Sequence, residues 1–186
     1  MILISQSKLN LDKDVDIDLV EIANEEYFCI SNVDAIRPFF MSIVSDWNHW
    51  MFISSNGGLT AGRKNAEYAL FPYYTDDKIT ESAEHTGSKT IIRIKRNMEV
   101  YLWEPFSVRS AGKYQIVRNL YKSKYGNKLL FEEINADLNL TFRYEWCSSR
   151  KYGFVRKASL LNQSDKGITV SCLDGLQNIL PAGVPS

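Results

Sequence analysis

The sequence has no excess of either charge: its 186 residues include 22 Lys and Arg against 22 Asp and Glu. Proteins that hold nucleic acid through its phosphates need a basic excess or a basic face, so the composition argues against nucleic acid as a partner. No apolar run approaches the roughly 20 residues that cross a bilayer, so we expect no membrane partner. Residues 1–8 lack the basic and apolar regions of a signal peptide, which leaves the compartment open with the cytoplasm slightly favoured.

Cysteine and histidine are also scarce. Cys29, Cys147 and Cys172 are widely spaced and form no Cys-x-x-Cys pair. Adding His49 and His85 gives no spacing that is typical of a zinc site. We therefore expect no metal and no cofactor, and we expect reduced thiols buried in apolar strands. A single disulfide stays an open alternative.

Hydrophobic residues, by contrast, make up 45% of the chain and aromatic residues 12%, enough for one domain with a substantial core. The clearest pattern is at 138–146, where apolar or aromatic residues alternate with polar ones, as in a half-buried strand. Residues 154–162 and 168–172 predict two more strands, joined by a polar turn at 162–167 with Gly167 at positive φ. The C-terminal third is thus predicted to be a meander of three antiparallel strands.

Weaker patterns of the same kind fill the rest of the chain. Further strands are predicted at 26–31, 39–45, 50–54, 90–95, 99–103, 114–121 and 128–134. Asn56, Gly57 and Gly58 predict a tight turn. Only 64–70 and 173–180 indicate a helical turn or two, and 76–87 is expected to be a surface loop. The pattern predicts an all-β fold, an antiparallel β-sandwich of about nine to eleven strands with one or two short helical turns.

The strand pattern and the composition of the C-terminal end also predict the domain organisation. Residues 1–186 are expected to form a single β-sandwich domain. The end at 181–186 contains two prolines and a glycine and is typical of a linker. This favours the N-terminal part of a longer multidomain enzyme, with a complete small protein carrying an irregular tail as the alternative.

Aromatic residues concentrate between positions 45 and 78. Aromatic faces offer rigid contact area to the apolar face of a sugar ring, while Asp, Asn and Arg side chains can address its hydroxyl groups. We therefore consider a sugar-binding site here, with core packing of the same aromatic residues as the alternative. The candidate substrate-binding residues are Trp47, His49, Trp50, Arg63, Tyr73, Tyr74 and Asp76.

No catalytic motif stands out. The glycines at 57, 58 and 62 match neither nucleotide-binding fingerprint, and no Gly-x-Ser-x-Gly is present. Adjacent carboxylates at 25–26, 76–77 and 132–133 would point to opposite faces of a strand and are expected to be solvated. We assign no catalytic residue, and His49 with Asp46 or Asp76 is the one arrangement that a small β-sandwich enzyme could use.

Three segments carry a resemblance to a known family. Residues 154–170 contain an arginine-bearing strand and an Asn-x-Ser-Asp turn, and residues 174–176 and 178–181 follow. Residues 50–63 contain the glycine-rich turn and run on to 71–73, and 103–107 read Trp-Glu-Pro-Phe-Ser. In patches that cover about half of the chain, these segments resemble the N-terminal β-sandwich domain of carbohydrate phosphorylases and glycoside hydrolases of the cellobiose phosphorylase type.

The resemblance implies a supersandwich-like fold that precedes a helical catalytic barrel, which this chain does not contain. In that family the general acid and the phosphate site lie mainly in the barrel, so the resemblance transfers no catalytic residue. The preferred hypothesis is a non-catalytic domain that supports a downstream catalytic domain of the same chain and lines part of its sugar site, with carbohydrate as the ligand and a homodimer as an open option. The alternative is a stand-alone carbohydrate-binding module that uses Trp47, Trp50, Tyr73 and Tyr74.

Overall fold

The computed structural model describes residues 13–96 and 98–181, which fold as an antiparallel all-β structure with one short α-helix. The fold class predicted from the sequence is confirmed. The described residues form twelve strands, slightly more than predicted. In chain order these are β1 (Asp16–Ile22), β2 (Glu25–Ser31), β3 (Phe40–Ser42), β4 (His49–Ser54), β5 (Leu59–Arg63), β6 (Gly87–Arg96), β7 (Glu99–Trp103), β8 (Ile116–Ser123), β9 (Lys128–Asn135), β10 (Leu140–Ser149), β11 (Gly153–Asn162) and β12 (Thr169–Gln177).

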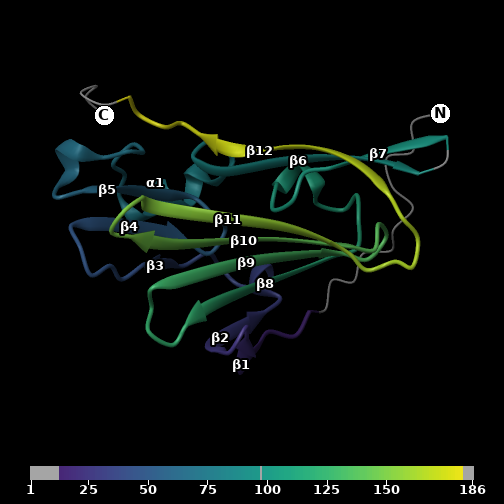
Figure 1. The fold of residues 1–186 in the computed structure, drawn as a ribbon, viewed down its shortest axis with the longest axis horizontal. Helices are drawn as coiled ribbons and strands as arrows, with labels where there is room; N and C mark the ends of the chain where they lie inside the picture. Colours follow the sequence, from purple (N-terminus) through teal and green to yellow (C-terminus); the bar gives the residue numbers. More distant parts are fainter. Residues whose placement is uncertain (1–12, 97, 182–186) are drawn as a thin grey trace.

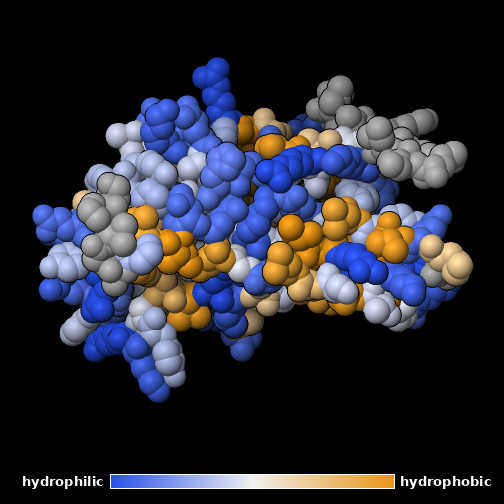
Figure 2. Space-filling view, turned by 90° about the horizontal axis from the view of Figure 1, so that it is seen from above, coloured by the Kyte–Doolittle hydropathy of each residue, from blue (hydrophilic) through white to orange (hydrophobic). Residues whose placement is uncertain are grey.

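The strands form three sheets. The largest has the order β1-β2-β8-β9-β10-β11, the second β12-β6-β7 and the third, the small sheet, β3-β4-β5. Figure 1 shows β12 and β6 as an upper layer above β11, β10, β9 and β8, with the small sheet beside them. Seen from above in Figure 2, the surface carries hydrophobic patches between hydrophilic side chains. Leu102 of β7 and Leu173 of β12 are among the exposed hydrophobic residues.

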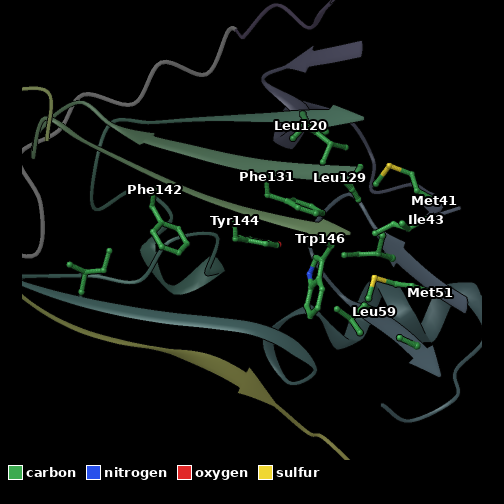
Figure 3. Packing of buried hydrophobic residues seen from close by; sticks show 14 of the residues in the cluster. Met41, Ile43, Met51, Leu59, Leu120, Leu129, Phe131, Phe142, Tyr144 and Trp146 are labelled. Carbon is green, nitrogen blue, oxygen red and sulfur yellow. The ribbon is translucent and has the colours of Figure 1, made fainter. Parts of the chain in front are cut away.

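The core lies where the three sheets meet. Alternation along β10 turns Phe142, Tyr144 and Trp146 inward, as the pattern at 138–146 predicts. They join one buried cluster with Met51 of the small sheet (Figure 3). Ile92 of β6, in the remaining sheet, belongs to the same cluster. Burying these large side chains is the main favourable term that holds the sheets together.

The predicted C-terminal meander is wrong in its last step. Strands β10 and β11 pair as expected, with Leu140 opposite Asn162, but β12 pairs with β6 in another sheet. Residues 163–168 therefore cross from one sheet to the next, and Gly167 does not adopt positive φ. A polar segment of this length suits a hairpin or a crossover equally well, so its composition does not indicate which strand comes next.

Several local predictions also change. The expected loop at 76–87 contains α1 (Asp76–Glu81) and a 3-10 turn (Ser82–Glu84), because Ile79 is buried beside the backbone of Gly58. The helical turn predicted at 64–70 is present as a 3-10 turn (Ala66–Tyr68), whereas 173–180 belongs largely to β12 rather than to a helix. The turn at 56–58 is confirmed, with Gly57 at a φ of 96°. Of the predicted linker, residues 182–186 lie outside the described residues.

The cysteines are free thiols, but only one is buried. Cys29 is buried, Cys147 is half-buried and Cys172 is exposed. The expectation of buried thiols is wrong for Cys172 because β12 is an edge strand, and most of its residues are open to solvent.

The carboxylates Glu132 and Glu133 are buried, not solvated as predicted. Glu133 accepts hydrogen bonds from Trp103 Nε1 at 2.8 Å and from Arg118 Nε at 2.8 Å, and Glu132 accepts one from Arg143 Nε at 2.6 Å. They do point to opposite faces of β9, and each face supplies its own arginine. These bonded pairs contribute to the structure, and both carboxylates are engaged in it.

Candidate functional site

The small sheet presents two different faces. Along β4 the side chains alternate, so His49, Met51 and Ile53 point inward while Trp50 and Phe52 point outward. Strand β5 follows the same division, because Arg63 lies opposite His49 and Gly62 lies opposite Trp50. The candidate site residues of these two strands therefore lie on different faces, with His49 and Arg63 on one and Trp50 on the other.

The outer face carries a continuous line of four aromatic rings, which we call the aromatic row: Phe40, Phe52, Trp50 and Tyr73. Phe40 stacks on Phe52 with ring centroids 5.3 Å apart, and Phe52 is 5.9 Å from Trp50. Tyr73 meets Trp50 edge-on at 5.8 Å. The ends of the row are open, since Phe40 is 45% and Tyr73 54% exposed.

A glycine determines how Trp50 lies in this row. A Cβ atom on Gly62 would sit 2.5 Å from Trp50 Cζ2 and 2.6 Å from the carbonyl oxygen of Tyr68. Only a residue without a side chain lets the indole lie against β5 while the following segment passes close by. The indole Nε1 atom is buried and has no hydrogen-bond partner among the described residues.

The inner face of the small sheet borders a cavity of about 370 Å³, which we call the basic cavity. It lies where the end of β5, the β10–β11 turn and the end of β12 meet. Four of the lining side chains are cationic, namely Arg63, Arg150, Lys151 and Arg156, and no Asp or Glu of the described residues lines it. The other lining residues are His49, Leu70, Phe71, Trp146, Tyr152, Gly153, Phe154, Leu176 and Ile179.

Two of the four cations are already paired. Arg156 makes two bonds to the Asp174 carboxylate, at 2.8 and 2.9 Å, and thereby ties β11 to β12. Arg150 forms an exposed ion pair with Asp46 at 2.8 Å. Arg63 has only a long contact to Asn48 Oδ1 at 3.5 Å, and Lys151 Nζ lies 4.9 Å from the centre of the Tyr152 ring.

His49 forms part of the cavity wall. Its ring packs edge-on against Phe154 at 5.2 Å. Burial lowers the pKa of His49, and the nearby Arg63 lowers it further, while Asp46 acts in the opposite direction. His49 Nδ1 and Trp146 Nε1 are both buried without a hydrogen-bond partner in the described part of the chain.

The structure thus divides the predicted site residues. Trp50 and Tyr73 belong to the aromatic row, and His49 and Arg63 line the basic cavity. Trp47 is exposed, with the Arg150 guanidinium 5.8 Å from its ring centre, and Asp76 lies in the exposed first turn of α1. Tyr74 is half-buried and contributes to neither feature.

Other residues of these two features were missed. Phe40 and Phe52 were missed because strand pairing brings them together, and a single sequence does not show that pairing. The cations of the β10–β11 turn had a weak sequence signal, the adjacent Arg150 and Lys151 beside Tyr152. Only the return of β12 to β6 makes that turn part of a cavity wall.

No catalytic arrangement forms around His49. Asp46 is engaged by Arg150, and among the described residues no carboxylate is hydrogen-bonded to the imidazole. No group of three or more His, Cys, Asp and Glu in residues 13–96 and 98–181 is placed to hold a metal ion. None of the helices in that part of the chain is long and apolar enough to cross a membrane.

Comparison with known proteins adds no family assignment. No protein-family model matches the chain, and no curated protein is significantly similar to it.

Proposed function

We propose that this chain is a non-catalytic β-sandwich domain of a carbohydrate-active enzyme and that it binds a neutral oligosaccharide along the aromatic row. The observation that carries the proposal is the row itself: four rings in contact, two of them about half exposed, on one face of a sheet. Each pyranose ring has a flat face of C–H groups, and such a face packs well on an aromatic ring. A row of rings therefore suits several consecutive sugar units.

The framework beneath the row supports this proposal. Met51, next to Trp50 in the same strand, is buried in the core, and Gly62 lets the indole lie close to the backbone. A binding surface held in place before the ligand arrives loses less entropy on binding.

The test is a calorimetric titration of the chain with neutral gluco- and xylo-oligosaccharides, comparing wild type with Trp50→Ala and Tyr73→Ala. We expect each substitution to weaken binding by about tenfold, as the loss of an aromatic anchor does in other interfaces. Tyr125→Ala is the matched control, because Tyr125 is 83% exposed and lies outside the row. Absence of binding by the wild type, or equal losses in the control, would contradict the proposal.

A stand-alone carbohydrate-binding module would use the same row, so titration alone does not separate it from a domain that works with a catalytic partner. The separating measurement adds a catalytic domain encoded in the same gene, which the preferred proposal requires and the stand-alone module does not. Association of the two domains, with faster turnover of a soluble oligosaccharide, would support the preferred proposal. Unchanged turnover with intact binding would favour the stand-alone module.

A further inference from the structure

Sugar stacking on the outer face of the small sheet does not explain the basic cavity beside its inner face. The whole chain is electrically balanced, with 22 cationic and 22 anionic residues. In the part of the chain that the structure describes, four cations and no carboxylate nevertheless line this one cavity. The excess of positive charge is thus a property of how the fold places these residues, and it points to a ligand with negative charge.

The charge that a ligand would meet comes chiefly from two residues. Asp174 neutralises Arg156, and Asp46 neutralises Arg150. Arg63 and Lys151 have no carboxylate partner among the described residues, so they leave about two positive charges at the wall. They come from β5 and from the β10–β11 turn, which border the cavity from different sheets.

The remaining wall suits a compact ring rather than a bare ion. Phe71, Leu176 and Ile179 supply apolar surface, and Tyr152, a residue that is 70% exposed, lies beside Lys151. The volume of about 370 Å³ is within the range of small-molecule sites. A single sugar unit with one charged substituent matches both the size and the mixed lining.

Two polar atoms of the cavity wall are buried. His49 Nδ1 and Trp146 Nε1 have no partner, which carries a free-energy cost, but both are covered from solvent. A ligand in the cavity would not touch them without some movement of the wall. The polar groups that a ligand meets directly are therefore the cationic side chains.

We propose that the basic cavity binds the oxyanion of an acidic sugar unit, that is, a phosphate, sulfate or carboxylate group on a single sugar ring. Arg63 and Lys151 hold the oxyanion, and the aromatic and aliphatic wall packs against the ring. The sugar part of this proposal rests on the proposed function, whereas the oxyanion part rests on the cations alone.

The experiment is a titration of the full chain, followed by NMR and calorimetry, with glucose phosphate, glucose sulfate, glucuronate, inorganic phosphate and neutral glucose as separate probes. At least one acidic sugar is expected to bind about tenfold or more tightly than glucose, because charge-assisted hydrogen bonds form only with the anion. That affinity should fall as sodium chloride is raised from about 50 to 500 mM. The three acidic sugars identify which oxyanion the cavity prefers.

Matched variants locate the site. Arg63→Gln and Lys151→Gln should each weaken the acidic sugar by about tenfold and leave the fold intact, which near-ultraviolet circular dichroism checks. Lys64→Gln and Lys157→Gln are the controls, because they remove exposed cations that neighbour the same segments without lining the cavity. Equal binding of glucose and the acidic sugars, or equal losses in control and cavity variants, would overturn the proposal. Inorganic phosphate binding as tightly as glucose phosphate would overturn its sugar part.

The two proposals fail independently. If neutral oligosaccharides bind through Trp50 while no acidic sugar binds, the cavity proposal alone is wrong. If acidic sugars bind through Arg63 while neutral oligosaccharides do not bind, the aromatic row is not a sugar site and the cavity result stands.

Discussion

The two faces of the small sheet are made by neighbouring residues and yet have different physical surroundings. Met51 and Ile53 point into the buried cluster, whereas Trp50 and Phe52, one position away, lie in a half-open aromatic row. The inner face also borders a cavity whose charged lining residues are all cationic, while the outer face offers aromatic rings. One strand thus supports a core, a basic cavity and an aromatic surface, because the side-chain period of two separates them.

The first prediction tests the difference in burial between the two faces. Met51→Ala should lower the free energy of unfolding by about 2–5 kcal/mol, since Met51 is 2% exposed and truncation leaves a cavity among packed neighbours. Phe52→Ala should lower it by only about 1 kcal/mol, because that ring is already partly solvated. Urea unfolding of both variants measures the two values. Equal losses of unfolding free energy would mean that the outer face is buried like the core, and the aromatic row would not be a binding surface.

The second prediction concerns the contact that holds Trp50 in the row. Gly62→Ala should destabilise the protein by about 1–3 kcal/mol, because the added methyl group meets the Tyr68 carbonyl as well as the indole. It should also shift the fluorescence of Trp50 and weaken oligosaccharide binding. Gly167→Ala is the matched control, since no atom lies within 4 Å of a Cβ at that position. Unchanged Trp50 fluorescence in Gly62→Ala would show that the row does not depend on this close approach.

The parts of the fold that depend on local sequence patterns were predictable, and the parts that depend on long-range packing were not. Periods of two are local, so the strands from β6 to β11 were placed within a few residues of their observed bounds. Strand β1 was missed because it is an edge strand with mostly exposed residues, and the acidic composition of its segment hides the alternation. The partner of β12 depends on the packing of sheets that are far apart in sequence, and no local pattern records it.

The site was predictable only in part for the same reason. Aromatic enrichment drew attention to β4 and its surroundings, and two residues of that set, Trp50 and Tyr73, lie in contact in the aromatic row. Sequence proximity, however, combined Trp50 with His49, which strand geometry places on opposite faces. The burial of Glu132 and Glu133 was missed because their arginine and tryptophan partners come from other strands.

The last prediction, with the smallest effect on stability, concerns the inner face and its one histidine. The pKa of His49 lies below its ordinary value of 6.5 in the folded chain, because burial and Arg63 disfavour the imidazolium. As the pH falls below about 6.5 the unfolded chain takes up this proton first, so the free energy of unfolding should decrease through the folded-state pKa. Above that range the contribution is fully present.

His49→Gln removes this titration and serves as the comparison in urea unfolding at several pH values. The difference in unfolding free energy between wild type and variant should change below about pH 6.5 and stay constant at higher pH. Arg63→Gln should reduce the dependence without abolishing it, since burial is the larger cause of the lowered pKa and remains in that variant. A pH-independent difference for His49→Gln would show that the imidazole is solvated in solution. The contrast between a buried inner face and a half-open outer face would then fail at His49, the position where the sheet borders the basic cavity.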